Sequence, residues 1–368
     1  MSRLAALLTL VAVLTMLPAA PALAHGGGGV TDASNFASTI GGVVTLDENR
    51  QATGPGEAPG VSWRVLANDA LLEVTNTSGT ELLVSGYENE PYLRMGPDGV
   101  WENRNSPATY LNNDRFGQTP VPERADAQAE PDWIRRGDGP TYRWHDHRIH
   151  WMATTMPPQV KVDPNVANVV LDWTVPFTID GERLGLQGQL NWVPGPSAWP
   201  WLLAGLALVA PPVLLALRRP PGAPRRRALR QVGVLLLTVV AGIDLVHAVD
   251  DLVAVPATLT ENLSAGSISA AILAIAALGI WKGREGRAGA ATALSIGAAV
   301  LVAGVGLTHL PSLTSSQVAT LLPVSFTRAV VALNLALIMP MAIVAWKGQE
   351  PWPDAAEQPQ PATAAPAP

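Results

Sequence analysis

The sequence predicts an extracytoplasmic all-β antiparallel sandwich followed by an α-helical transmembrane bundle of about five spans. Short runs of alternating apolar and polar residues, separated by turn residues, fill the first half of the chain. Long apolar runs fill the second half, beginning at Trp199. The composition agrees with this division, since 48% of the 368 residues are hydrophobic and only 15% are charged, a lopsided balance for a soluble protein.

The N-terminus has the three parts of a secretory signal peptide, which we predict to be residues 1–24. Arg3 supplies the positive charge, residues 4–17 form the apolar core, and Ala-Leu-Ala at 22–24 matches a small-residue cleavage pattern. The apolar core is too short to span a membrane comfortably. Cleavage at this position would make His25 the first residue of the mature chain and would export the domain that follows.

Residues 25–198 are expected to form the β-domain. Its strand-like runs are 42–46, 61–66, 71–75, 81–85, 91–95, 100–103, 168–175 and 184–193. The turn sequences at 76–79, 96–99 and 180–181 are each expected to close a hairpin between the two runs that flank them. The stretch 112–140, rich in Pro, Asp, Gly and Arg, is expected to be a long surface loop. Short strands, frequent turns and no convincing helix favour a sandwich.

Five apolar stretches have the length of transmembrane helices. They cover about 199–217, 232–255, 263–281, 288–310 and 326–346. Basic residues follow the first, third and last stretches, at 218–230, 282–287 and Lys347, so alternate counting puts all of them on one side of the membrane. The positive-inside rule makes that side the cytoplasm, and the signal peptide puts the β-domain on the other side. Two independent signals therefore predict an outer N-terminal domain and a cytoplasmic C-terminus.

The composition also indicates the source of the chain. Ala, Gly and Pro are abundant and Arg exceeds Lys, a bias typical of a high-GC bacterium, so we expect a multi-pass protein in the lipid bilayer of a bacterial cell membrane. The net charge of −6 and the lack of a basic tract before the membrane region predict no nucleic-acid partner. Residues 348–368 are expected to be a disordered cytoplasmic tail, and Pro323 and Pro340 to limit or kink the last helix.

The absence of cysteine excludes several kinds of site. The chain can form no disulfide, no thiolate metal site, no iron–sulfur cluster and no cysteine nucleophile. Its sequence also contains no phosphate-binding loop, dinucleotide fingerprint, serine-hydrolase elbow or zinc-protease motif, so neither an enzyme nor a nucleotide-binding protein is expected. A metal ion would have to be held by His, Met, Asp, Glu, backbone or amine groups.

The first candidate metal site is the histidine-rich stretch 144–152, which reads W-H-D-H-R-I-H-W-M. On a strand, His145 and His147 would point to the same face and could reach one ion. His150 would have to come round a turn or bind with the opposite face, and Met152 adds a thioether suited to copper. The alternative is a partly exposed aromatic strand whose histidines form hydrogen bonds with the long loop.

The second candidate is His25 at the predicted mature N-terminus. Its α-amine and ring nitrogen could chelate one copper ion, whereas the alternative is that a histidine follows the cleavage site by chance. The third candidate lies in the second span, where Asp244, His247 and Asp251 fall on one helical face. Together with residues at similar depth, the predicted intramembrane polar cluster is Asp244, His247, Asp250, Asp251, His309 and Arg328.

Ionisable groups at membrane depth cost about 2.5–3.5 kcal/mol each on insertion scales, so they are usually paired and functional. The intramembrane cluster could hold a metal ion or a proton, or could form a docking surface for the β-domain. The alternative is an ion-paired cluster, for example Asp251 with Arg328, that fixes helix packing.

A signal peptide that ends at a histidine, a β-sandwich, and helices with His and Asp near the outer face together resemble the copper-resistance CopC/CopD arrangement. That resemblance rests on His25, on His145 with His147, and on His247. It implies a periplasmic sandwich that binds copper through its first residue and a further histidine, beside a membrane part with intramembrane histidines. The β-domain is longer and the spans are fewer than in that family. The W-H-D-H-R-x-H-W-M stretch also resembles that of bacterial multi-pass envelope proteins.

Two functions remain open. The first is a membrane-anchored protein that binds or transfers a metal ion, with copper as the favoured ion and an envelope protein as donor or acceptor. The second is a non-catalytic cell-envelope protein whose β-domain binds another protein or the cell wall, with a structural intramembrane cluster. Convergence of the β-domain histidines with the intramembrane cluster would favour the first, and wide separation the second.

Overall fold

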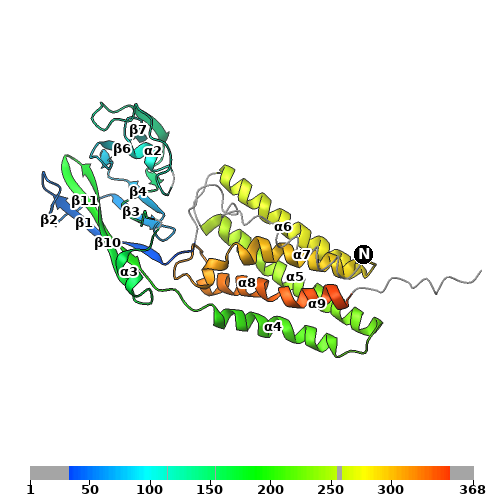
Figure 1. Ribbon diagram of the computed structural model, residues 1–368. Helices are drawn as coiled ribbons and strands as arrows, with labels where there is room; N and C mark the ends of the chain where they lie inside the picture. Colours follow the sequence, from blue (N-terminus) through cyan, green and yellow to red (C-terminus); the bar gives the residue numbers. More distant parts are fainter. Residues whose placement is uncertain (1–32, 114, 154, 255–258, 349–368) are drawn as a thin grey trace, which may run out of the picture.

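The computed structural model describes residues 33–348, apart from 114, 154 and 255–258. In this part of the chain a β-domain is followed by a helical bundle and lies at one end of it (Figure 1). The predicted signal peptide, His25 and residues 349–368 of the predicted tail fall outside the described residues. The predicted fold class is confirmed, because the structure has an antiparallel two-sheet sandwich and five helical segments able to cross a membrane.

The larger sheet consists of β1 (Phe36–Leu46), β2 (Ala52–Pro55), β5 (Leu82–Ser85), β6 (Pro91–Gly96), β7 (Gly99–Asn103), β8 (Trp133–Gly137), β10 (Asn168–Ile179) and β11 (Glu182–Trp192). Their order across the sheet is β2-β1-β11-β10-β5-β6-β7-β8. Two of the predicted hairpins, β6–β7 and β10–β11, are confirmed. The second closes through Asp180 and Gly181, whose φ angles of 50° and 76° are the positive values that a two-residue hairpin turn favours.

The smaller sheet consists of β3 (Val61–Leu66), β4 (Leu71–Asn76) and β9 (Thr141–Trp144). The predicted hairpin between the runs 71–75 and 81–85 is wrong, because β4 pairs with β3 and β9 whereas β5 pairs with β6 and β10. The turn at 76–79 instead carries the chain from one sheet to the other. The predicted loop 112–140 is interrupted by β8, which pairs with β7. Two short helices complete the domain, α2 (Ala108–Leu111) and α3 (Pro158–Val162).

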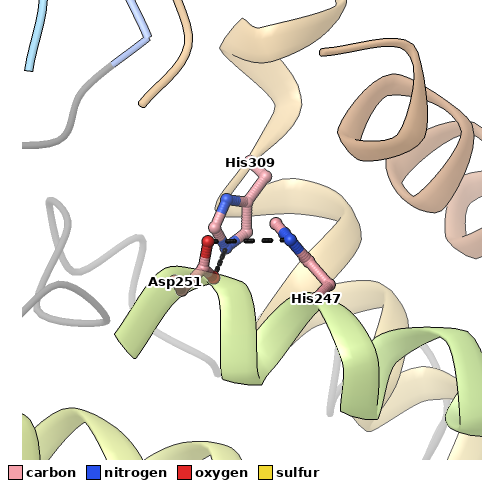
Figure 2. A group of neighbouring side chains, drawn as sticks. All are labelled: His247, Asp251 and His309. Carbon is pink, nitrogen blue, oxygen red and sulfur yellow. Dashed lines mark ion pairs between the residues drawn. The ribbon is translucent and has the colours of Figure 1, made fainter. Parts of the chain in front are cut away.

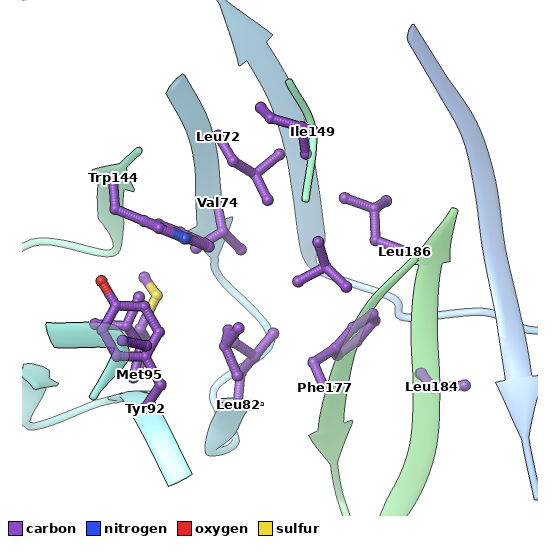
Figure 3. Close-up of a cluster of buried hydrophobic side chains, with 14 of the residues drawn as sticks. Leu72, Val74, Leu82, Tyr92, Met95, Trp144, Ile149, Phe177, Leu184 and Leu186 are labelled. Carbon is purple, nitrogen blue, oxygen red and sulfur yellow. The ribbon is translucent and has the colours of Figure 1, made fainter. Parts of the chain in front are cut away.

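Apolar side chains from both sheets fill the space between them (Figure 3). Leu72 and Val74 of β4 and Leu82 of β5 are completely buried there. Trp144, the last residue of β9, packs edge-on against Tyr92, with ring centroids 6.2 Å apart. Burial of each large apolar side chain contributes about 1.5–3 kcal/mol. The core therefore holds the end of β9 firmly, and with it the start of the histidine-rich stretch.

The bundle consists of α4 (Trp199–Leu217), α5 (Ala223–Ala254), α6 (Leu259–Glu285), α7 (Ala290–Leu301), the π-helix η1 (Val302–Leu307), α8 (Val324–Ala336) and α9 (Ile338–Lys347). In the described residues these make five membrane-crossing segments, because α7 continues into η1 and α8 into α9. The chain is therefore a multi-pass membrane protein. α5 starts at Ala223, inside the basic stretch 218–230 and before the predicted start of the second span at about 232. The break between α8 and α9 falls at Leu337, just before Pro340, which has no N–H to continue the helical bonding.

The β-domain and the bundle meet through residues 308–323, the junction segment, which connects η1 to α8 and contains the short helix η2 (Leu310–Leu313). Ser34 and Gln317 exchange two backbone hydrogen bonds of 3.0 and 2.9 Å. The amide of Ser316 donates a hydrogen bond of 2.7 Å to Oδ1 of Asn35. The start of β1 is thus tied directly to the end of the bundle.

Candidate metal centre

The polar residues of α5 that were predicted for the intramembrane cluster have separate partners in the structure. Asp244 contacts α8, Asp250 contacts the junction segment, and His247 and Asp251 contact His309. His247 is buried, with 2% of its surface exposed. The predicted single cluster is therefore three neighbouring arrangements at the end of the bundle that faces the β-domain.

His247, Asp251 and His309 form the candidate metal centre. In the described part of the chain they are the one group of three or more His, Asp or Glu side chains whose ligand atoms all lie within 4.8 Å of one another. Nδ1 of His247 is 3.6 Å from Oδ1 of Asp251, and Nε2 of His309 is 3.6 Å from Oδ2 of the same carboxylate. Figure 2 shows the three side chains pointing toward one another, with the two imidazole rings on the same side of the carboxylate.

Two features of the helices bring these residues together. His247 and Asp251 are four residues apart on α5 and therefore lie on the same face, one turn from each other. His309 comes from another part of the bundle, at the start of the junction segment and two residues after the π-helix η1 that continues α7. η1 can approach α6 closely because Gly304 lies against Ile272, where a Cβ would overlap the isoleucine side chain.

The donor set suits a first-row transition-metal ion. Two imidazoles and one carboxylate are ligands that Zn²⁺, Cu²⁺ and Fe²⁺ accept. Ligand atoms about 2.0–2.2 Å from one tetrahedral ion lie about 3.3 Å apart. Here each histidine nitrogen lies 3.6 Å from a different oxygen of Asp251, and one ligand atom from each residue can be chosen so that all three lie within 4.8 Å of one another, so small side-chain adjustments would bring the set to that spacing. Three protein ligands leave at least one coordination position for water or for an exchanging group. The residues therefore fit a bound metal ion held by both histidines and the carboxylate of Asp251.

Asp250 and Arg328, also predicted for the cluster, hold the junction segment instead. Oδ1 of Asp250 accepts a hydrogen bond of 3.0 Å from the amide of Leu321, and Oδ2 accepts one from the hydroxyl of Thr320. The guanidinium of Arg328 donates to two backbone carbonyls of the same segment. The ion pair suggested between Asp251 and Arg328 is wrong, because in the described residues Asp251 pairs with the two histidines.

Asp244 has a partner that the sequence analysis missed. Its Oδ1 accepts a hydrogen bond of 2.8 Å from Nδ2 of Asn334 on α8. Asn334 is completely buried, and Gly306 of η1 packs so closely that an added Cβ would lie 3.1 Å from the Cβ of Asn334. The available signal was the one amide side chain in the predicted span 326–346.

The histidines of the β-domain are not arranged as the sequence analysis expected. β9 ends at Trp144, so the predicted strand face shared by His145 and His147 is wrong. Nδ1 of His145 lies 2.8 Å from the carbonyl oxygen of Ala70. The ring of His147 stacks on Tyr87 at a centroid separation of 5.8 Å. The histidines of this turn do not belong to the group of convergent ligand atoms found among the described residues.

The turn that carries these histidines is fixed by buried charge. Asp146 is completely buried and accepts two hydrogen bonds from the Arg148 guanidinium and one from Nε1 of Trp144. Burial acts to raise the pKa of Asp146, but the positive charge of Arg148 and these hydrogen bonds outweigh it and lower the pKa below its ordinary value. Burial, together with the positive charge of Arg115, lowers the pKa of His150 to about 3. Met152, beyond the turn, is exposed.

The predicted site residues thus fall into two regions. Those of the bundle include one convergent set, His247, Asp251 and His309, whereas those of the β-domain are held by contacts within a packed turn. Thr320 and Asn334 were missed because an isolated hydroxyl or amide gives no pattern in the sequence. In comparisons with known proteins, no family model, no curated protein and no solved structure matches the chain.

Proposed function

We propose that this membrane protein binds a transition-metal ion at His247, Asp251 and His309. It would receive the ion from a donor, or deliver it to an acceptor, on the side of the membrane where the β-domain lies. The observation that carries the proposal is the convergence of three ligand atoms within 4.8 Å from two separate parts of the bundle. A purely structural ion pair would need one histidine. A second imidazole beside the same carboxylate adds the donor that a metal ion requires.

Copper is the ion that we expect to bind most tightly. The affinity of a site with nitrogen and oxygen ligands rises along the first-row divalent ions to Cu²⁺ and falls again at Zn²⁺. The layout resemblance to the CopC/CopD arrangement favours the same ion. Zn²⁺ is the natural competitor, because it accepts the same ligands and the same coordination number.

We also propose that the β-domain and the metal centre lie outside the cytoplasm of a bacterial cell. The basic stretches 218–230 and 282–287, and Lys347, lie at the helix ends remote from the β-domain (Figure 1). The positive-inside rule makes that end cytoplasmic. Because the chain has no cysteine, a cysteine introduced at Asp138 or at Arg226 would be its only thiol. A membrane-impermeant thiol reagent added to intact cells should label the first and spare the second, and the reverse labelling would refute this orientation.

A second function is supported by a different observation. Asp250 and Arg328 direct their hydrogen bonds to the junction segment, which holds the start of β1. In a non-catalytic envelope protein whose β-domain binds another protein or the cell wall, the whole polar region would serve to fix the β-domain on the bundle. His247 and His309 would then contribute packing and hydrogen bonding only.

Metal titration of the full-length protein in lipid nanodiscs separates the two functions. Isothermal calorimetry with Cu²⁺ and with Zn²⁺ should show about one tight site per chain, with Cu²⁺ the tighter ion. The double replacement His247→Ala with His309→Ala should abolish that site. Asp250→Asn is the matched control, because it changes a carboxylate on the same helix that lies outside the convergent set, and it should bind metal like the parent.

The β-domain histidines provide the other control. His147→Ala should leave the tight site intact. If this variant lost the tight site, the metal site would have to be assigned to the histidine-rich turn instead. A parent protein that binds neither ion, or a double variant that binds as tightly as the parent, would contradict the metal proposal. The structural function in the envelope would then take its place.

A further inference from the structure

A second polar pair lies deeper in the bundle than the metal centre. Asp244 precedes Asp251 by two turns of α5, about 10.5 Å along the helix. Its Oδ1 accepts a hydrogen bond from Nδ2 of Asn334, which also donates to the carbonyl of Val330 at 3.0 Å. Asp244 is 2% exposed and Asn334 is completely buried. Both hydrogens of the amide group are thus in use, and the pair is shielded from solvent.

Two oxygens of this pair lack a hydrogen-bond partner, Oδ2 of Asp244 and Oδ1 of Asn334. Buried polar atoms rarely lack a hydrogen-bond partner, because the desolvation free energy of such an atom is then not offset by a hydrogen bond. An ionised carboxylate only accepts hydrogen bonds, so it cannot satisfy the amide oxygen. A protonated carboxyl has one O–H donor. A single proton on Oδ2, donated to Oδ1 of Asn334, would therefore satisfy both atoms and close a two-bonded acid–amide pair.

The charges around Asp244 favour the same protonation state. The ion pairs of the described residues do not include Asp244. Of the helices packed against α5, α4 and α7 carry no ionisable side chain, and the guanidinium of Arg328 on α8 is bonded to the junction segment. His247 lies one turn away in the direction of the β-domain. The basic residues of α5, α6 and α9 lie in the turns at the opposite end of the bundle, so a carboxylate here would have no nearby counter-charge.

We infer that Asp244 and Asn334 form an intramembrane proton-binding site, with one proton held between Oδ2 of Asp244 and Oδ1 of Asn334. A hard metal cation suits the site less well, because Mg²⁺ and Ca²⁺ take six or more oxygen ligands and the pair offers two unused ones. The proton site is distinct from the metal centre and stands whether or not that centre binds an ion.

Infrared spectroscopy of the full-length protein in nanodiscs detects such a proton, because the carbonyl stretch of a carboxylic acid is separate from the amide and carboxylate bands. At neutral pH the difference spectrum of parent minus Asp244→Asn should contain one acid band, which shifts to lower frequency in D₂O. Asp244→Asn keeps the shape of the side chain and gives Asn334 an N–H donor, so the pair and the fold should persist. Asn334→Leu should move the band to higher frequency, because the acid loses its acceptor.

Asp250→Asn is the matched control, since both oxygens of Asp250 already have donors and its difference spectrum should contain no acid band. The absence of an acid band for Asp244 would overturn the proton site. A carboxylate band that responds to NaCl and not to KCl would overturn it too, by identifying a bound cation. Cu²⁺ titration separates this site from the metal centre, because Asp244→Asn should bind Cu²⁺ like the parent. Loss of that binding would place Asp244 in the metal centre and end its role as a separate site.

Discussion

The two groups of histidines in this chain differ in how their side chains are used. In the β-domain, three histidines lie within six residues, yet His145 meets a backbone carbonyl and His147 stacks on a tyrosine. In the bundle, His247 and His309 are far apart in the sequence, yet their rings meet edge-on at a centroid separation of 4.6 Å, both beside the carboxylate of Asp251. A dense motif is therefore not the same as a convergent site.

The difference follows from the backbone that carries each group. The histidine-rich stretch leaves β9 and turns around Asp146. The rings of His147 and His150 pack edge-on with centroids 5.4 Å apart, but among the described residues the ligand atoms of this turn do not form a convergent group of three. His247 and Asp251 lie one turn apart on the long helix α5, and His309 lies at the start of the junction segment, two residues after η1, so two separate parts of the bundle aim side chains at one point. Convergence across rigid elements is the arrangement that a metal ion needs.

The largest effect is expected from breaking the turn of the β-domain at Asp146. Asp146→Ala would leave the buried guanidinium of Arg148 without its carboxylate, and loss of one partner of a buried pair costs about 3–5 kcal/mol. Urea unfolding of the full-length protein, followed by near-ultraviolet circular dichroism, should show this loss. Asp138→Ala is the control, because its pair with Arg135 is exposed and should contribute about 0–1 kcal/mol. Equal effects of the two replacements would contradict a turn fixed by buried charge.

A smaller effect is expected when metal binds to the bundle. An ion present at about 100 times its dissociation constant stabilises the folded state by about 2.7 kcal/mol. Thermal unfolding of the parent with Cu²⁺ should therefore occur at a higher temperature, and His309→Ala should remove the gain because it deletes one of three ligands. His147→Ala should retain the gain. If Cu²⁺ still raised the unfolding temperature of His309→Ala but no longer raised that of His147→Ala, the metal site would lie in the β-domain and not in the bundle.

The next effect depends on pH and belongs to the β-domain alone. With its pKa lowered from 6.5 to about 3, His150 stays neutral in the folded protein over a range where the unfolded chain takes up a proton. Stability should therefore fall as the pH drops from about 6.5 towards 3, by up to about 1.4 kcal/mol per pH unit from this residue. His150→Gln should remove that part of the slope.

The measurement is urea unfolding at several pH values above about 4, where Asp146 stays ionised because its pKa lies below the ordinary value. The difference in unfolding free energy between the parent and His150→Gln should shrink as the pH falls. Val160→Ala is the control, since it weakens the buried core without removing a titratable group and its deficit should not change with pH. A constant deficit for His150→Gln would show that the ring is not held neutral.

The features that could be predicted from the sequence are those with a local signal. Alternating strands and long apolar runs identified the sandwich and the five spans, and Asp180 with Gly181 identified its hairpin. The turn at 76–79 looks the same in the sequence, but it connects two sheets, because turn residues show that the chain reverses and not which strand it pairs with. The partner of a strand depends on how its apolar face packs in the core, which a local turn signal does not show.

For the candidate metal centre, too, only the part with a local signal could be predicted from the sequence. The four-residue spacing of His247 and Asp251 is a helical signal that needs no tertiary structure. The contact of His309 with them depends on the π-helical turns of η1, and the partner of Asp244 depends on where Asn334 falls on α8. Neither can be read from one helix alone. The strand assumed for His145 failed because Trp144 anchors the end of β9 in the core and the chain turns directly after it.

The smallest effect concerns the junction between the two regions. The hydroxyl of Ser316 donates a hydrogen bond of 2.7 Å to the carbonyl of Val193, at the end of the β-domain, so Ser316→Ala should weaken the junction by about 1 kcal/mol. Hydrogen exchange of the amides of Ser34 and Gln317, which bond to each other, should then become about fivefold faster. Thr314→Val is the control, because its hydroxyl bonds only within the junction segment and its loss should leave both amides unchanged. Exchange that stays slow in Ser316→Ala would show that the backbone pairing of Ser34 with Gln317, and not the hydroxyl of Ser316, holds the β-domain on the bundle.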